Sequence, residues 1–513
     1  MPGQPCTIAV DIGTTTVKAV ALTDTDERQI AQRRIPLDTW TDDAGAAEQD
    51  PAVVYDAVTG ALAATAVEAR RTGHRIARVG ISTAMHSLLA IGADDRPISR
   101  AILWRDSRAR DEAAALWQTP EGRATYERTG TPIHAMTPLV KLVWLRNRCP
   151  DVLSAAARLT SLKEWVWHGW FGDWIADASM ASATGLYNLR EGNWDAGALA
   201  LAGIDCSRLS ALVWPTFVQR GVGETRLLDA GLGPDTPFNV GASDGVLANL
   251  GVGAVGEKRL VCSIGTSLAL RIGSRQPVSD VASRPFCYVL DRDRFIVGGA
   301  SNSGGLILDW LGRHVVSAES TAREAGIGQL LHEAGSVETG ALVCLPYLAG
   351  ERAPLWNASI RAAFFGVDAA QGKAHLVRAA IEGILLNARW ILDVTLRFAR
   401  PETVIVSGRP FEHGWVRQLA ADMLGLPVVH SGTVDASLVG AARLARVATH
   451  DAGWEDVASP DVRQEQPLGL SPGAAEVPIK YERFRRLVEV AADVFTPGQP
   501  APPDDSRPSG SQA

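Results

Sequence analysis

The hydrophobic pattern in the first half of the chain predicts alternating strands and helices. Residues 7–22 place apolar, β-branched runs on both sides of a short Gly-Thr turn, which predicts a β-hairpin. Residues 52–72 have the apolar spacing of an amphipathic helix, and residues 78–82 have the character of a buried strand. Strands that alternate with helices favour α/β layers over a helical bundle or a β-sandwich.

A second hairpin repeats the features of the first. Residues 260–272 again have an apolar strand, an Ile-Gly-Thr turn and an apolar strand, and Ser263 stands 252 positions after Asp11 (263 minus 11) in the equivalent place. A repeat at half the chain length suggests duplicated domains that face each other. A chance match of two short hairpins is the alternative.

Both turns have the composition of a phosphate-binding turn. Gly13, Thr14 and Thr15 in the first turn, and Gly265 and Thr266 in the second, offer backbone N–H groups and hydroxyls without bulk. Asp11 ends the first strand, where its carboxylate can hold a hydrated divalent cation. We therefore expect one nucleotide to be gripped from both sides, with the metal on the first side.

Asp244 is the main candidate for chemistry near the midpoint of the 513 residues. It lies between Gly241 and Gly245, in a predicted turn before a helix at residues 246–250. Two glycines beside an acid let the backbone approach a ligand and leave the carboxylate uncrowded. An ordinary turn is the alternative.

Polar and aromatic side chains follow the apolar strands, where α/β proteins bind ligands. Met85 and His86 follow the strand at residues 78–82, and Trp104 lies in a similar loop. Structural roles for a lone His or Trp remain the alternative.

In the second half, Gly304 and Gly305 precede a predicted helix at residues 306–311, as suits an anionic or nucleotide ligand. The loop at residues 345–354 contains Glu351-Arg352, which we interpret as a structural charge pair.

Composition narrows the function classes. The chain is 46% hydrophobic and 21% charged with a net charge of -7, which argues against non-specific binding to nucleic acid or membrane surfaces. Six cysteines without a CxxC pair argue against a metal or disulfide framework and favour the cytoplasm. No P-loop motif occurs, and the glycine pattern at residues 251–256 follows a predicted helix instead of the strand that a dinucleotide fingerprint requires.

The two ends of the chain add two expectations. The N-terminus has no basic, apolar leader and no apolar run reaches 18 residues, so we expect neither secretion nor a membrane span. Residues 496–513 are rich in Pro, Ser, Gly and Asp, which predicts a disordered tail.

Two longer segments identify a family. Residues 362–382, with Phe364-Phe365-Gly366, His375-Leu376 and Ala379-Ala380-Ile381-Glu382, resemble the second signature of the FGGY carbohydrate kinases. Residues 136–145 match the first signature, although Arg148 departs from its usual polar end. The resemblance covers about residues 7–494. It implies an α/β, actin/hexokinase-like (ribonuclease H-like) duplicated fold with an interdomain cleft, an N-terminal domain at 1–245 and a C-terminal domain at 246–495.

The resemblance also implies a mechanism with ATP and Mg²⁺. Asp244 would be the general base on a sugar hydroxyl, and Asp11 would hold Mg²⁺, mainly through water. The residues expected at the β- and γ-phosphates are Gly13, Thr14, Thr15, Lys18, Gly265 and Thr266, and those expected at the adenosine are Gly304, Gly305 and Gly408. The family usually has a second glycine where this chain has Arg409-Pro410, which puts the adenosine contacts in doubt.

Within the family, several segments are most similar to gluconokinases, although xylulokinases share some of them. These segments are Met85–Leu88, Thr129–His134, Leu162–Trp165 and Ala181–Asn188. An ionised sugar acid in a buried site needs a cation or several donors. Lys163, the first choice, is also consistent with a surface lysine that opens a helix, and Met85, His86 and Trp104 complete the predicted substrate site. His134 and Arg105 are further candidates for the carboxylate.

The leading hypothesis is therefore an ATP-dependent kinase of D-gluconate. A kinase of a neutral sugar such as xylulose is the nearest alternative, and an actin- or chaperone-like ATPase is an alternative of another class. A sugar-binding regulator without catalysis would not need both Asp11 and Asp244. The expected partners are a sugar or sugar acid and ATP, without nucleic acid or membrane, and a homodimer is one possible assembly.

Overall fold

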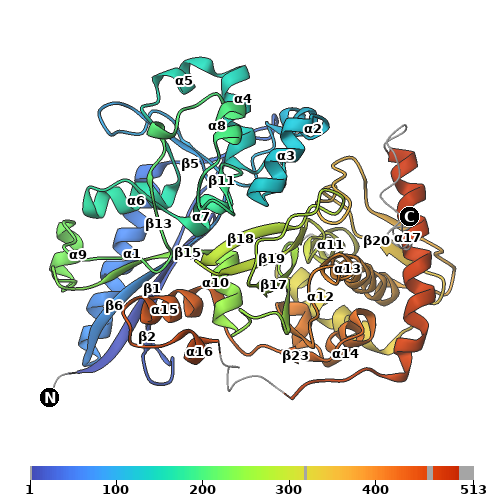
Figure 1. Cartoon of the computed structure of the whole chain (residues 1–513). Helices are drawn as coiled ribbons and strands as arrows, with labels where there is room; N and C mark the ends of the chain where they lie inside the picture. The colour runs from blue at the N-terminus through green and yellow to red at the C-terminus, as the bar shows by residue number, and fades with distance from the viewer. Residues whose placement is uncertain (1–2, 317–319, 459–465, 496–513) are drawn as a thin grey trace, which may run out of the picture.

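Two six-stranded sheets form the framework of the protein, seen in Figure 1 in a computed structural model of the chain. The structure describes residues 3–316, 320–458 and 466–495. The tail predicted at residues 496–513 lies outside the described residues. The first sheet contains strands from the first half of the chain, and the second contains strands from the second half.

The first sheet has the strand order β14-β15-β6-β1-β2-β3. Its strands are β1 (Gln4–Ile12), β2 (Thr16–Thr23), β3 (Gln29–Pro36), β6 (His74–Thr83), β14 (Val218–Gln219) and β15 (Phe238–Ser243). Strands β1 and β2 pair antiparallel with Asp11 opposite Lys18, so the first predicted hairpin is confirmed. Strands β1 and β6, and then β6 and β15, pair in parallel.

The second sheet has the order β18-β19-β17-β16-β22-β23 and repeats this arrangement. Its strands are β16 (Arg259–Ile264), β17 (Leu268–Ser274), β18 (Phe286–Asp291), β19 (Arg294–Ser301), β22 (Thr403–Ser407) and β23 (Val428–His430). Strands β16 and β17 form the second predicted hairpin, with Ile264 opposite Leu268. In both sheets three antiparallel strands are followed by two parallel ones: β3-β2-β1-β6-β15 and β19-β17-β16-β22-β23. The predicted duplication therefore extends to five strands of each sheet, while the sixth strand, β14 or β18, lies at opposite edges of the two sheets.

Helices and short strands connect and cover the two sheets. The helices of the first half are α1 (Pro51–Arg71), α2 (Arg110–Gln118), α3 (Pro120–Thr129), α4 (Pro138–Arg148), α5 (Pro150–Ala155), α6 (Leu162–Phe171), α7 (Ala178–Ser182), α8 (Ala196–Ala202), α9 (Thr225–Asp229) and α10 (Asp244–Gly251). Those of the second half are α11 (Leu306–Leu311), α12 (Ser320–Glu333), α13 (Lys373–Thr395), α14 (Gly414–Leu424), α15 (Ala436–Ala448), α16 (Trp454–Val457) and α17 (Val477–Phe495).

The remaining elements are short. The strands are β4 (Trp40–Thr41), β5 (Ala47–Gln49), β7 (Leu89–Ile91), β8 (Ala101–Ile102), β9 (Arg158–Thr160), β10 (Ile175–Asp177), β11 (Tyr187–Asn188), β12 (Asn193–Trp194), β13 (Ala211–Val213), β20 (Val343–Leu345) and β21 (Ala363–Phe365). The single-turn helices are η1 (Cys206–Arg208), η2 (Gly312–Val316), η3 (Ala334–Ser336), η4 (Arg409–Glu412) and η5 (Pro472–Glu476).

Helix α1 shows how the first sheet is covered. The Asp50 side chain accepts a hydrogen bond from the backbone N–H of Ala52, and Pro51 occupies the first turn, where its missing N–H costs nothing. Val58 and Leu62 are fully buried in the cluster formed with β1 and β2. By length and composition, α1 is the one helix among the described residues that could cross a membrane, but half of its most apolar window is buried inside the protein.

Helices α10 and α15 cross where the two halves of the chain meet. A Cβ on Gly440 of α15 would lie 2.0 Å from the carbonyl oxygen of Leu247, and one on Gly251 would lie 1.9 Å from that of Ala436. Helix α15 also packs on the first sheet, because Ala441 lies directly against Gly80 of β6. Glycine is therefore required wherever these backbones touch, and α15, which belongs by sequence to the second half, joins it to the first sheet.

We predict that Gly440→Ala destabilises this junction by about 1–3 kcal/mol, as extra volume does in a packed interior. The added methyl group would meet backbone atoms, which cannot move aside as a flexible side chain can. Thermal unfolding measures the effect, with Gly256→Ala as the control, because a Cβ on Gly256 meets nothing within 4 Å. Equal melting temperatures for the two variants would contradict the close approach.

Candidate active site

Asp244 is the first residue of α10 and directly follows strand β15, so it begins a helix and does not lie in an open turn. Gly241 has φ of 71°, and a Cβ there would lie 1.7 Å from the carbonyl oxygen of Ile81. Only glycine lets β15 pass so close to β6. The carboxylate of Asp244 accepts the N–H of Gly245 at 2.7 Å.

The surroundings of Asp244 suit a base that works near neutral pH. Asp244 is only partly exposed, and desolvation of its carboxylate, followed by the charge of Asp11, raises its pKa to about 6. The positive charge of Arg271 opposes this rise. A catalytic base is most effective when its pKa is close to the working pH.

Asp11 lies at the end of β1, beside the first turn. Its carboxylate accepts a hydrogen bond from the hydroxyl of Ser82 at 2.5 Å. Burial raises the pKa of Asp11, while Ser82 and the charge of Lys18 lower it. Lys18 is ion-paired with Asp435, the residue before α15, at 2.7 Å. This pair joins the first hairpin to the second half of the chain.

The first turn is anchored through its carbonyl oxygens. The carbonyl of Thr14 accepts the side-chain amide of Gln49 at 2.7 Å, and that of Thr15 accepts the N–H of Leu37 at 2.9 Å. A Cβ on Gly13 would lie 2.7 Å from the carbonyl oxygen of Thr16. The tight turn therefore fits only glycine at this position, as predicted for a phosphate-binding turn.

The second turn meets the predicted adenosine residues. The N–H of Gly305 donates to the carbonyl of Gly265 at 2.7 Å, and that of Leu306 donates to Thr266 at 3.1 Å. Gly408 has φ of 112° and would place a Cβ 2.0 Å from the carbonyl oxygen of Ile264. Strands β16 and β22 and the start of α11 thus bring these glycines to one end of the second sheet.

His86 is held in an unusual backbone conformation. Its φ of 71° is left-handed, which few residues other than glycine adopt without support. Its ring Nδ1 lies 2.8 Å from the carbonyl of Ala183, and burial lowers the pKa of His86 to about 3. A neutral ring that donates from Nδ1 keeps Nε2 as an acceptor. His86 is therefore suited to accept a hydrogen bond from a ligand hydroxyl.

Lys141 of α4 is hydrogen-bonded to the backbone of His86. Its ammonium group is buried and donates to the carbonyl of His86 at 2.5 Å and to that of Ile102 at 3.3 Å. Burial lowers the pKa of Lys141 to about 7, while the charge of Asp106 raises it. Lys141 therefore links the loop that contains Met85-His86 to the segment that leads to Trp104.

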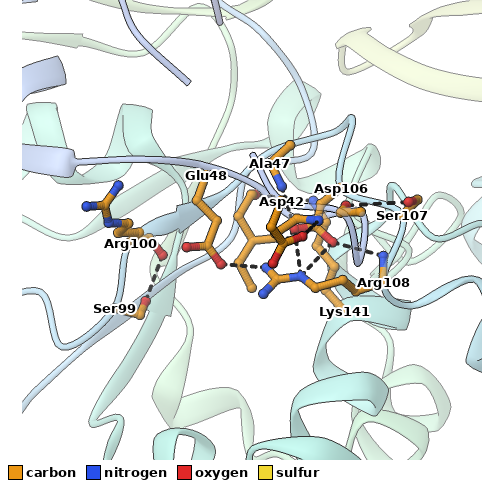
Figure 2. A network of polar contacts seen from close by, with 12 residues as sticks. Asp42, Ala47, Glu48, Ser99, Arg100, Asp106, Ser107, Arg108 and Lys141 are labelled. Carbon is orange, nitrogen blue, oxygen red and sulfur yellow. Dashed lines mark hydrogen bonds and ion pairs between the residues drawn. The ribbon is translucent and has the colours of Figure 1, made fainter. Parts of the chain in front are cut away.

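Figure 2 shows the polar network beside Lys141. Asp106 accepts the backbone N–H of Ala47 at 3.0 Å and pairs with Arg108 at 2.6 Å. Arg108 also pairs with Glu48 at 2.5 Å. Its guanidinium group lies over the ring of Trp144. The loop that contains Trp104 is therefore fixed at its end by a buried carboxylate and two ion pairs.

Two arginines from the second half of the chain, Arg271 and Arg352, contact residues of the first half. Arg271 of β17 donates to the hydroxyl of Ser263 at 3.1 Å, and a Cβ on Gly245 would lie 3.3 Å from its Nε. Arg352 is buried, with Nη2 3.2 Å from the carbonyl of Ser301 and Nη1 3.7 Å from the sulfur of Met136. Across the described ranges, no carboxylate oxygen lies within 4 Å of either guanidinium. Asp244 and Glu351 act on these arginines only through longer-range charge, so neither guanidinium is held in an ion pair and both keep donors for an anionic ligand.

A divalent cation would have a small set of protein ligands here. Among residues 3–316, 320–458 and 466–495, no three His, Cys, Asp or Glu side chains form a cluster that could hold a metal. Asp11 offers a desolvated carboxylate beside the first turn, and hard cations such as Mg²⁺ prefer oxygen ligands and keep several waters. The site therefore fits Mg²⁺ held mainly by water and by nucleotide phosphates.

Comparison with known proteins identifies the family. Models of the N-terminal and C-terminal domains of the FGGY family of carbohydrate kinases match residues 6–251 and 260–449. The chain belongs to this family. The predicted resemblance and the predicted two-domain kinase fold are thereby confirmed, and carbohydrate kinases use ATP as the phosphate donor.

The similar proteins include kinases with different acceptors. The gluconokinase of Bacillus subtilis (strain 168) is 37% identical over 450 residues, covering 86% of this chain and 87% of that protein. A solved gluconate kinase from Lactobacillus acidophilus has a TM-score of 0.87 at 28% identity and covers 96% of this chain and 99% of its own. A ligand-bound xylulose kinase from Lactobacillus acidophilus gives the same TM-score, identity and coverage.

In this FGGY kinase Met85 lies close to the candidate base, whereas the charge of Lys163 is engaged by an acid. Met85 approaches Asp244, since its Cε would lie 3.0 Å from a Cβ on Gly245. Lys163 and Asp177 form a buried ion pair at 2.7 Å. The charge of Lys163 is thus already neutralised, so the interpretation as a free surface lysine is wrong and its role at a ligand carboxylate loses support.

The remaining candidates vary in exposure. Trp104 and His134 are partly buried, and Arg105 is exposed. Burial and the charge of Arg352 lower the pKa of His134 to about 3. Arg409 is also exposed, while Pro410 is buried at the start of η4, where a backbone donor is not required.

The sequence interpretation missed three cations of the FGGY kinase site. Lys141 lies in an apolar run of α4, and Arg271 lies in an apolar run of β17. A lone cation within an apolar run is the sequence feature that could have indicated these two residues. Arg352 was assigned to a structural pair with Glu351. The two charges do interact, but they form no direct ion pair, because the Glu351 carboxylate accepts the hydroxyls of Ser301 and Ser303 at 2.8 and 2.6 Å.

We predict that Lys141→Met lowers kcat/KM for the carbohydrate acceptor about 10- to 100-fold, because small displacements of a positioning group are costly. Without the ammonium group, the left-handed backbone of His86 loses a donor to its carbonyl. Steady-state kinetics measures the loss, with Arg148→Met on the exposed side of the same helix as the control. Unchanged kinetics would show that Lys141 does not position His86.

Proposed function

We propose that this FGGY kinase phosphorylates D-gluconate to 6-phospho-D-gluconate, with Asp244 as the general base. The observation that supports this choice is Arg352. It is buried, has no carboxylate within 4 Å in the described parts of the chain, and its charge lowers the pKa of both His86 and His134. Burial lowers the pKa of Arg352 and the charge of Glu351 opposes this, but the two side chains form no ion pair, so the guanidinium keeps donors free. A buried cation that makes no ion pair is costly unless an anion contacts it directly.

Gluconate supplies such an anion at the end opposite its reacting hydroxyl. Its carboxylate is ionised at pH 7 and would pair with Arg352, which replaces Lys163 as the first candidate. His86 would accept a hydrogen bond from a hydroxyl in the middle of the sugar acid through Nε2. Met85 and Trp104 would contact the carbon chain, as predicted from their loops. A gluconokinase is also among the relatives that cover most of this chain.

At the reacting end, Asp244 would accept the proton of the 6-hydroxyl as its oxygen attacks the γ-phosphorus of ATP. The bond between that phosphorus and the bridging oxygen breaks, and its electron pair stays with the departing ADP. Gly13, Thr14 and Thr15 from the first turn would bind the β- and γ-phosphates opposite Gly265 and Thr266. Lys18 is paired with Asp435 but, unlike Lys163, is partly exposed, so its ammonium group would be shared between Asp435 and the phosphates. Gly304, Gly305 and Gly408 would border the adenosine.

Asp11 would hold Mg²⁺ through water. Bound Mg²⁺ supplies positive charge that neutralises the phosphate oxygens during transfer. Ser82 orients the Asp11 carboxylate through its 2.5 Å hydrogen bond. With Asp11 engaged by the metal, Asp244 stays free to take the proton.

A neutral ketose such as xylulose is the second candidate acceptor. The xylulose kinase of Lactobacillus acidophilus matches the fold as well as the gluconate kinase does. A neutral acceptor, however, would leave Arg352 without an ion pair. The actin- or chaperone-like ATPase is set aside by membership of a carbohydrate kinase family.

A panel of acceptors tests the proposal. ADP release is measured with gluconate, xylulose, ribulose and glycerol at equal concentrations, with Mg-ATP saturating. We expect turnover with gluconate to exceed that with each neutral acceptor. Absence of gluconate turnover, with activity on xylulose, would replace the proposal by the second candidate. A cytoplasmic location, a homodimer and the domain boundary at 245/246 stay predictions.

A further inference from the structure

Arg271 is the charged side chain closest to Asp244 that the proposed mechanism leaves without a role. It lies on β17, and its Nη1 donates to Ser263 at 3.1 Å. Its Nε and Nη2 face Gly245, because a Cβ there would lie 3.3 and 3.4 Å from them. Its charge lowers the pKa of Asp244. These donors therefore point toward the start of α10, where the base is.

The duplicated hairpins differ in the charges on the strands that flank their turns. In the first hairpin Asp11 lies opposite Lys18, so an acid and a cation are neighbours. In the second hairpin Ser263 takes the place of Asp11 and is hydrogen-bonded to Arg271. Because serine is neutral, the second hairpin offers a net positive charge beside its phosphate turn. The first hairpin, by contrast, is arranged to hold a cation.

We propose that Arg271 is a further catalytic residue, which donates hydrogen bonds to the non-bridging oxygens of the phosphoryl group during its transfer to the sugar. Phosphoryl transfer is accelerated mainly by positioned positive charge and donors around these oxygens. The inference rests on the proposed role of Asp244 in the same site. Arg271 forms no covalent bond and transfers no proton.

The alternative ligand for Arg271 is the carboxylate of a sugar acid. That group is separated from the reacting hydroxyl of gluconate by the whole carbon chain, whereas Arg271 lies beside Asp244 and Ser263. Arg352, near His134 and Met136, is better placed for the far end. Both arginines influence the pKa of Tyr288, so both lie near this tyrosine. The two cations would thus serve opposite ends of one acceptor.

The test compares Arg271→Met, Arg271→Lys and Arg352→Met in the full chain. The acceptor is whichever sugar the wild type phosphorylates fastest, so a failure of the gluconate proposal is detected separately in the wild type. We expect Arg271→Met to lower kcat about 100- to 1,000-fold, as loss of one preorganised donor does. Arg271→Lys should recover part of this loss.

Binding measurements separate the possible roles. With acceptor present, Mg-ADP and aluminium fluoride mimic the group in transfer, and we expect Arg271→Met to weaken this complex at least 100-fold. Affinities for ADP and acceptor alone should change less than about threefold, which also shows that the variant is folded. The proposal is overturned if acceptor affinity falls while the fluoride complex is unchanged, or if kcat is restored by raising the pH.

Discussion

Asp244→Asn lowers kcat for gluconate phosphorylation about 100- to 10,000-fold, the usual contribution of general-base catalysis. The amide has nearly the same shape as the carboxylate but cannot accept the proton of the sugar hydroxyl. Positioning by the two turns and by bound Mg-ATP remains, so the residual rate stays above that in water. Single-turnover kinetics with saturating gluconate and Mg-ATP measures the chemical step.

The control for this prediction is nucleotide affinity. The residues expected around the phosphates lie in the two turns, and the Asp244→Asn substitution would leave both turns unchanged. Isothermal titration with Mg-ADP should therefore give an affinity within about threefold of the wild type, well below the 1.4 kcal/mol of a tenfold change. A variant that keeps near-normal kcat would show that another group takes the proton.

The pH dependence of kcat/KM is a second test of Asp244 as the base. Asp244 acts in its ionised form, and its pKa is raised to about 6, first by desolvation and then by the charge of Asp11, which bound Mg²⁺ would offset. The wild-type kcat/KM should therefore fall with decreasing pH around a midpoint above about 4 and up to about 6, approaching tenfold per pH unit. An acid limb near pH 4 would contradict this assignment, because an unshifted aspartate titrates near that value.

Arg352→Met raises the KM for gluconate by about 30- to 4,000-fold, which corresponds to the roughly 2–5 kcal/mol lost when one partner of a buried charge pair is removed. Methionine keeps much of the apolar volume but leaves the substrate carboxylate without a donor. The KM for a neutral acceptor such as xylulose should change far less. Initial-rate kinetics with both acceptors measures the difference.

Arg352→Lys is the matched variant. It retains the charge but cannot keep the contacts of the guanidinium with Ser301 and Met136 and bind a carboxylate at the same time. We expect an intermediate KM for gluconate. If both variants weakened gluconate and xylulose equally, Arg352 would have a structural role, and the preference for a sugar acid would need another origin.

The sequence was sufficient to predict the framework of the site. The two hairpins, the position of Asp11 and Lys18 in the first, and the helix at residues 306–311 all depend on local patterns of apolar residues and glycines. The same local patterns placed Gly265, Gly305 and Gly408 on turns after strands. Because strands of one sheet end at a common edge, these turns meet in the fold.

Pairings between distant residues could not be predicted in this way. Lys163 lies in the first turn of α6, and nothing in its own segment reveals Asp177, which ends β10 and neutralises it. Arg352 follows Glu351 directly, so a local pair was the natural interpretation, but the glutamate is occupied by hydroxyls on β19 and the loop after it. Which cation stays free for a ligand is decided by these tertiary contacts.

The central claim is that the site prefers an ionised sugar acid to a neutral sugar. Its most direct test is the ratio of kcat/KM for D-gluconate to that for D-xylulose, measured on the wild type with saturating Mg-ATP. A specific ion pair with Arg352 predicts a ratio of about 100 or more, since breaking such a pair costs several kcal/mol. A ratio at or below one would contradict the account.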